Sequence, residues 1–180
     1  MRLDLGVGAQ PAEIAGAAPG DELVRAPDVV MDRGFDLPAE PEQVWPWIAQ
    51  LGKGRAGWYL PRWVERFLPR CGRPLRRIEP SWQHLRPGDV IPDWGGRNAN
   101  FEIVRHDPPE LLLHHSTRGA LQLSWAIILR PTSTGSRVHL RLRMSGIRHR
   151  RLAEIGGGLV DLLTVAGLAV GLRERVTASR

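Results

Sequence analysis

The sequence predicts an α+β domain in which a curved antiparallel sheet of about seven strands wraps around a long C-terminal helix. Three observations support this fold class. Short strand-like stretches follow one another between residues 76 and 145, and residues 137–145 alternate between basic and apolar side chains. Residues 152–176 have the length and apolar content of a long helix. Because strands and helices do not alternate along the chain, a parallel sheet is not expected.

The elements before this series are an arm, one strand and two short helices. Prolines and glycines interrupt any regular period in residues 1–27. A strand is expected at 29–37, followed by a helix that begins near Pro41 and ends at Gly52, where Pro46 falls inside the helical stretch. A second short helix and six strands should follow, at 63–68 and then at 76–78, 89–93, 101–106, 111–116, 122–130 and 137–145.

Length and composition fit a single domain at residues 28–176 with a tail at 177–180. The only cysteine, Cys71, excludes an intramolecular disulfide, and residues 1–20 lack the apolar run of a secretory signal, so a cytoplasmic protein is expected. The formal net charge is +6, and the only lysine, Lys53, lies in a Gly-rich turn. Such a wet position disfavours Schiff-base chemistry.

Several segments resemble a known superfamily. They are Val44-Trp-Pro-Trp-Ile48, the stretch from Gln50 to Tyr59 with its Arg-Ala-Gly-Trp-Tyr block, Trp63-Val-Glu-Arg66, Gly88-Asp-Val-Ile-Pro92 and Ser124-Trp-Ala126. Over most of its length the chain is similar to a bacterial branch of the SRPBCC superfamily, the START-like group of polyketide cyclases, dehydrases and lipid-transport proteins. The resemblance implies a helix-grip fold with a deep ligand cavity. It implies no single activity, because binding proteins and enzymes share the scaffold, and it carries over no catalytic residue or cofactor.

The stretch Gly52-Lys-Gly-Arg-Ala-Gly57 matches the letters of a dinucleotide-binding fingerprint. That fingerprint must follow a strand and open the helix of a βαβ unit, whereas here it follows a helix. We therefore interpret it as a tight reversal between two helices. Two roles are considered for Arg55: a cation that anchors a ligand, or a structural group that binds loop carbonyls and a carboxylate such as Glu65 or Asp93.

Candidate catalytic groups are few. His114 and His115 are adjacent on a strand, so only one of them can face a cavity and the two cannot chelate one metal ion. Either could act as a general base, together with Asp93, Tyr59 and Arg55, in a cyclase-type or aromatase-type enzyme. The histidines show no metal-ligand spacing, so no metal and no cofactor are expected.

Two segments, one with a basic face and one almost entirely apolar, each have two interpretations. The stripe Arg137, His139, Arg141, Arg143 is interpreted as a solvated outer face, partly paired with acids on neighbouring strands, rather than a nucleic-acid site, because no aromatic residues interleave with it. Residues 155–172 are apolar almost all round, which fits a helix gripped by the sheet. A peripheral contact of this helix with an anionic membrane, or with a second copy of the chain, is kept as an alternative.

The leading functional hypothesis is a protein that sequesters a hydrophobic small molecule, such as a lipid, a polyketide-like compound or an isoprenoid. Its cavity is expected to hold about 300 to 1,000 Å³. The residues expected to line it are Trp47, Arg55, Trp58, Tyr59, Trp94, Trp125, Leu140, Leu142 and Leu163.

Overall fold

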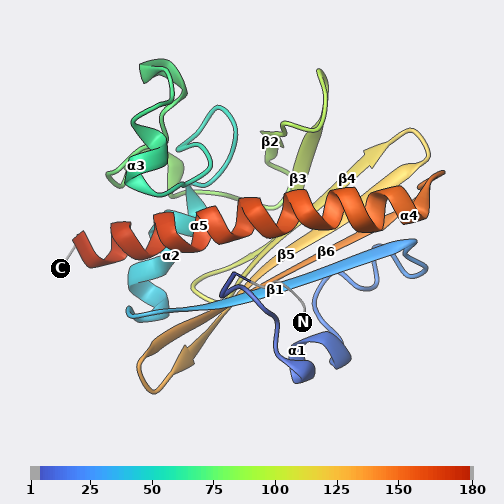
Figure 1. Ribbon diagram of the computed structural model, residues 1–180, viewed down its shortest axis with the longest axis horizontal. Helices are drawn as coiled ribbons and strands as arrows, with labels where there is room; N and C mark the ends of the chain where they lie inside the picture. The colour runs from blue at the N-terminus through green and yellow to red at the C-terminus, as the bar shows by residue number, and fades with distance from the viewer. Residues whose placement is uncertain (1–4, 179–180) are drawn as a thin grey trace.

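The computed structural model describes residues 5–178 and shows a curved six-stranded antiparallel sheet with one long helix packed across it (Figure 1). The sheet order is β1-β6-β5-β4-β3-β2, so the first and last strands pair. The strands are β1 (Val29–Leu37), β2 (Val90–Pro92), β3 (Asn100–Asp107), β4 (Leu111–Arg118), β5 (Leu121–Thr132) and β6 (Gly135–Ser145). The α+β fold class predicted from the sequence is confirmed.

One expected strand, residues 76–78, lies outside the sheet. The backbone there bonds to a side chain instead of a neighbouring strand. The Gln50 amide donates to the Arg77 carbonyl at 3.1 Å and accepts from the Glu79 amide at 2.9 Å. Gln50 is fully buried, so it supplies the hydrogen bonds that a partner strand would otherwise have to provide.

Helix α2 (Pro41–Ala49) fills part of the space beneath the sheet. Pro41 occupies the first turn, where no amide hydrogen is needed, and Glu40 and Gln43 form a reciprocal cap. The helix contacts β5, β6 and α5, and Trp47 and Ile48 are buried with most of its other residues. Helix α3 (Arg62–Glu65) is shorter than the expected span of 63–68.

The turn between these helices adopts the tight reversal expected of the glycine-rich stretch. Gly52 and Gly57 exchange backbone hydrogen bonds of 3.3 and 3.0 Å. Both glycines have positive φ, which L side chains rarely adopt. The turn follows α2 rather than a strand, so the dinucleotide interpretation is excluded by its context.

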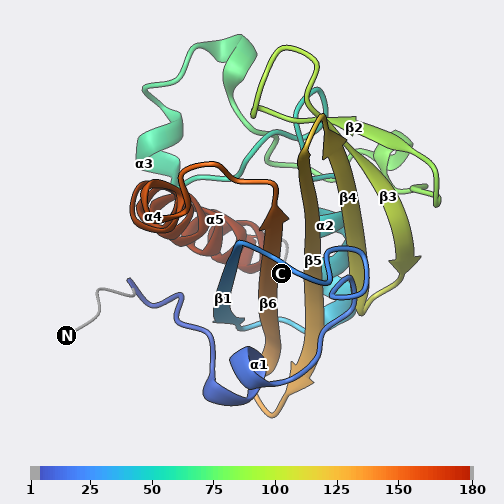
Figure 2. The ribbon, with the colours of Figure 1, turned by 90° about the vertical axis from the view of Figure 1, so that its right-hand side faces the viewer.

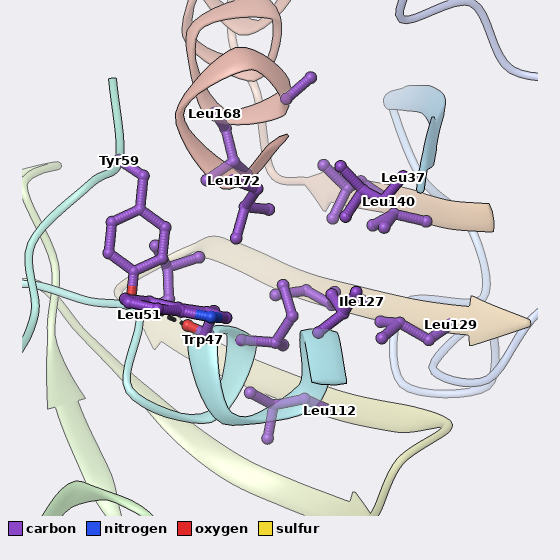
Figure 3. Packing of buried hydrophobic residues seen from close by; sticks show 14 of the residues in the cluster. Leu37, Trp47, Leu51, Tyr59, Leu112, Ile127, Leu129, Leu140, Leu168 and Leu172 are labelled. Atoms are coloured by element: carbon purple, nitrogen blue, oxygen red, sulfur yellow. Dashed lines mark hydrogen bonds between the residues drawn. The ribbon is translucent and has the colours of Figure 1, made fainter. Parts of the chain in front are cut away.

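The C-terminal helix has three parts: α4 (Arg150–Leu152), a π-helical turn η3 (Ala153–Gly157) and α5 (Gly158–Ala178). Its buried residues begin only at Leu162 and continue through Val176. Figure 3 shows Leu168 and Leu172 of this helix facing Leu140 and Ile127 of the sheet. Close packing at this end requires a glycine, because a Cβ at Gly171 would lie 2.7 Å from the Leu60 backbone nitrogen.

The basic face of β6 was expected to be solvated, which is wrong, but the expected pairing with an acid on a neighbouring strand is present at Asp32 of β1. The N-terminal arm, which includes α1 (Pro11–Ala15), covers this face (Figure 2). Arg137 pairs with Glu13 at 2.8 Å, and Arg141, only 4 % exposed, pairs with Asp21 at 3.1 Å and Asp32 at 2.8 Å. The arm therefore turns an amphipathic strand into one that is covered on both faces.

The same arm explains why β5 lacks a clean alternation. Ala126 and Ile128 form a second small core with Leu111 and Leu113 on the face opposite α5, and Ala18 and Leu23 of the arm pack against it. Apolar residues on both faces of β5 are thus buried by different partners, α2 and α5 on one side and the arm on the other.

Candidate ligand pocket

A small pocket with aromatic walls opens at one end of the sheet, beside the turn that follows α2. Its volume is about 60 Å³, far below the 300 to 1,000 Å³ expected. Separate parts of the chain contribute to the walls: the α2–α3 connection, β2 and the turn after it, and strands β3, β4 and β5. The lining residues are Leu51, Gly52, Trp58, Ile91, Pro92, Asp93, Trp94, Phe101, His114 and Trp125.

The rings in this pocket pack on one another in a continuous cluster. The Trp125 ring lies nearly parallel to the rings of His114 and Trp58, with centroid distances of 4.8 and 6.0 Å and interplanar angles below 30°. Phe101 meets Trp125 at 6.0 Å, and Trp94 stands edge-on to Trp58 at 6.3 Å. Such stacked and edge-to-face pairs are favourable arrangements for aromatic rings. They also account for the small volume, because the rings occupy most of the space they enclose.

Strand register and one long-range hydrogen bond position these rings. His114 of β4 lies directly opposite Trp125 of β5 in the ladder, so both side chains emerge on the same face. The Trp58 indole Nε1 donates to the Thr164 carbonyl of α5 at 3.0 Å. This bond ties the loop after α2 to the C-terminal helix and holds Trp58 against the cluster.

His114 is a buried neutral imidazole. Its Nδ1 lies 3.2 Å from the Trp125 carbonyl oxygen, which can only accept, so Nδ1 carries the hydrogen and Nε2 is the basic nitrogen. Burial lowers the pKa of His114 to about 4, although the bond to the carbonyl acts in the opposite direction. The imidazole is therefore uncharged at neutral pH and can accept one hydrogen bond through Nε2. The neighbouring His115 does not line the pocket.

Asp93 lies at the mouth of the pocket but its carboxylate is already engaged. It pairs with Arg118 at 2.7 Å and accepts from the Gly95 amide at 3.2 Å. Lys53 donates to the Asp93 carbonyl at 3.0 Å. Trp94 follows directly and is 53 % exposed, so it covers the pocket while remaining in contact with solvent.

Tyr59 lies in the core rather than in the pocket. Its hydroxyl donates to the Trp47 carbonyl at 2.9 Å and accepts from the Gln50 amide at 3.0 Å, and burial raises its pKa. The Arg175 guanidinium stacks 4.1 Å from the Tyr59 ring centre and pairs with buried Glu65 at 2.8 Å. Both hydrogen-bonding functions of the hydroxyl are occupied, which suits a structural role.

The other expected lining residues also lie elsewhere. Trp47 and Leu140 belong to the main core, and Leu142 is half-buried on β6. Leu163 is 54 % exposed on the outer side of α5, because the opposite side of that helix faces the sheet. Arg55 donates to the Ala49 and Trp82 carbonyls at 3.0 and 2.6 Å, which is the structural role considered for it, although neither suggested carboxylate is its partner.

Of the residues singled out from the sequence, the structure thus brings together Trp58, Trp94, Trp125, His114 and Asp93. Phe101 was missed. A signal for it was present, because Phe101 and Ile103 alternate with polar Glu102 on an expected strand, which places both on one face. Leu51 and Ile91 lie on an expected helix and an expected strand, but nothing in the sequence distinguishes them from other core residues of those elements.

Within residues 5–178 there is no group of three or more His, Cys, Asp or Glu side chains placed to hold a metal ion. The groups that line the pocket offer one imidazole nitrogen and one carboxylate that is already paired with an arginine. The pocket is therefore suited to a ligand that is mostly apolar and stacks on rings.

No protein-family model matches this sequence, and no curated protein matches it either. Solved structures do resemble it. A protein from Rhodobacter sphaeroides has a TM-score of 0.52 at 16 % identity, covering 85 % of this chain and 95 % of its own. A protein from Staphylococcus saprophyticus also reaches 0.52, at 13 % identity, with 84 % and 93 % covered.

A more distant match is a Polyketide_cyc-like protein from Corynebacterium glutamicum, at 13 % identity and a TM-score of 0.39, with 83 % of this chain and 87 % of that chain covered. This likeness is too remote to bear on function. The two structures at 0.52 establish that the chain shares its sheet-and-helix fold with bacterial proteins of known structure.

Proposed function

We propose that this protein binds a small, flat, hydrophobic molecule in the aromatic pocket. The observation that carries the proposal is the convergence of three tryptophans, Phe101 and a buried neutral His114 from distant parts of the chain. Large rings that stack around an interior space are typical walls of a pocket for apolar ligands.

Binding requires the pocket to open. A volume of about 60 Å³ corresponds to roughly two water molecules in the liquid, which is too little for a ring system. Trp94 is the ring best placed to move, because it is half exposed and its turn continues through Gly95 and Gly96. We infer that Trp94 swings outward and that the ligand takes its place against Trp58, so the ligand stabilises a more open state of the same fold.

The chemistry of the pocket narrows the ligand class. Apolar rings form most of the walls, and His114 presents an acceptor at Nε2 because Nδ1 is already donating. A ligand with one hydroxyl on an aromatic or otherwise flat ring system would satisfy this acceptor while its apolar surface stacks on Trp58 and Trp125. A phenolic or polyketide-like molecule has this character, whereas an extended acyl chain would gain little from the stacking walls.

A titration with 2-naphthol tests the proposal. The wild-type protein should bind it saturably, with quenching of tryptophan fluorescence, and Trp58→Leu should weaken binding by about tenfold because a stacking wall is lost. Trp63→Leu is the matched control, since Trp63 is exposed and does not line the pocket. Equal affinity of both variants for 2-naphthol, or no saturable binding even when Trp94→Gly opens the mouth, would contradict the proposal.

A second candidate is an enzyme of the cyclase or dehydrase type, because His114 and Asp93 both line the pocket. His114 would accept a proton through Nε2. Its pKa of about 4 makes it a weak base, and a general base works best with a pKa near the working pH. Binding is therefore the better supported of the two. The enzyme hypothesis would be supported if the protein turned over a bound phenolic or polyketide-like compound and if His114→Gln abolished this turnover while the compound still bound.

A further inference from the structure

The outer side of the C-terminal helix carries a row of exposed apolar side chains, named here the α5 stripe. Leu152, Ile155, Leu159 and Leu163 recur three or four residues apart, which places them along one side of the helix. Together with Val160 they are between 52 and 77 % exposed. Exposed apolar residues are common singly, but a continuous row of this length marks an interaction surface.

Packing in the hydrophobic core does not explain why the side chains of this row are apolar. Helix α5 buries Leu162, Val165, Leu168 and Leu172, none of which belongs to the stripe. Residues 150–178 form the one described helix long and apolar enough to cross a membrane, yet only 33 % of its most apolar window is buried. Between β1, the arm and the first half of this helix lies an open groove of about 760 Å³, and Leu159 of the stripe is one of the residues that line it.

The stripe is also free of unbalanced charge. Asp161 is the only charged residue between Ile155 and Leu172, and it is neutralised by Arg33 at 2.7 Å. The same pair anchors α5 to β1. Pulling this helix out to span a bilayer would break that pair and expose the core, so the surface is suited to lying on a membrane and not to crossing it.

Basic side chains flank the stripe at both of its ends. Arg148, Arg150 and Arg151 are exposed immediately before Leu152. Glu154 pairs with Arg150, and the Asp28 carboxylate accepts a hydrogen bond from the Ile147 amide at 2.9 Å. At the other end, α3 lies beside α5 in both views (Figures 1 and 2), joined to it by the bond from the Arg62 amide to Glu174. The α3 segment adds exposed Trp63 and Phe67 with further arginines at 62, 66, 70 and 73.

We propose that the α5 stripe and its arginine rim dock the protein flat on an anionic lipid bilayer. Leucine and isoleucine side chains at the centre would enter the boundary between headgroups and acyl chains, while the arginines contact anionic headgroups. A second copy of the chain is a poorer partner, because it would bring the same positive rim against this one. The docking face shares no lining residue with the aromatic pocket, so the two proposals stand separately.

Vesicle co-sedimentation of the full chain tests this docking. Binding to phosphatidylcholine vesicles with about 30 mol % phosphatidylglycerol should exceed binding to phosphatidylcholine alone, and should fall when salt is raised from about 0.1 to about 0.5 M. Leu159→Glu with Leu163→Glu should lower the partition coefficient about tenfold or more, because two anchoring side chains become charged. Replacing Arg148, Arg150 and Arg151 by Gln should lower it roughly fivefold for each arginine removed.

Val90→Glu is the matched control, because Val90 is also apolar and exposed but lies on β2. It should bind vesicles like the wild type. Thermal unfolding of each variant shows whether the fold persists. If the Leu159/Leu163 variant does not fold, Ile155→Glu tests the stripe at another exposed position. Absence of vesicle binding by the wild type, or equal binding by Val90→Glu and the Leu159/Leu163 variant, overturns the proposal. So does a concentration-dependent dimer, seen by light scattering, that the leucine substitutions abolish while vesicle binding is absent.

Discussion

Acidification is expected to destabilise this protein through His114. The side chain is buried beside Trp125, and burial holds its pKa at about 4, compared with an ordinary value of 6.5. Between these two values the unfolded chain binds a proton that the folded chain does not, so stability falls as the pH falls. Each pH unit in this window removes about 1.4 kcal/mol, so the loss begins near pH 6.5 and reaches roughly 3 kcal/mol near pH 4.

Comparison with His114→Asn isolates this effect. The Asn amide nitrogen takes the place of Nδ1 and can donate to the Trp125 carbonyl, but it does not titrate. Urea unfolding of both proteins at about pH 7.5 and about pH 4.5 should show the wild type losing roughly 2.5 kcal/mol more than the variant over this range. All other titrating groups are shared, so their contributions cancel in the difference. Parallel stability curves for the two proteins would refute the reasoning, since they would mean that His114 does not stay neutral in the folded state.

Two further substitutions probe the contacts that assemble the fold. Arg141→Met should destabilise the protein by about 3 kcal/mol or more, because it leaves Asp32 with a buried carboxylate that has lost one partner. It should also speed limited proteolysis within residues 10–25, whereas Arg130→Met, at an exposed position on β5, should change neither. Gly171→Ala should cost about 1 to 3 kcal/mol in thermal unfolding, because its Cβ would meet the Leu60 backbone. Gly156→Ala, which meets nothing within 4 Å, should be neutral or slightly stabilising, and equal effects of the two glycine substitutions would refute the close approach of α5 to Leu60.

Much of the secondary structure was accessible from local patterns. The alternation in residues 137–145 identified β6 and correctly separated its basic side from its apolar side. Pro41 and Gly52 bracket α2 closely, as caps and breakers act within a few residues of themselves. The strand expected at 76–78 failed because a distant side chain, Gln50, satisfies that backbone, and no pattern within the segment reveals this.

The candidate site was only partly accessible. Five of its residues were singled out as unusual aromatic or ionisable groups, yet Trp47 and Tyr59 have the same character and lie in the core. Which aromatic residues meet depends on register, as with His114 opposite Trp125, and on tertiary bonds such as the one from Trp58 to Thr164.

Local periodicity was enough to predict the two sides of β6 and the long apolar helix, because each pattern is carried by neighbouring residues. What each side meets depends instead on tertiary contacts. The arm neutralises the arginines of β6 through partners more than 100 residues away, and α5 turns Leu162 inward while Leu163 stays outside. Periodicity shows which residues share a side, but burial depends on the segment that packs against it, and that partner is chosen by contacts distant in the chain.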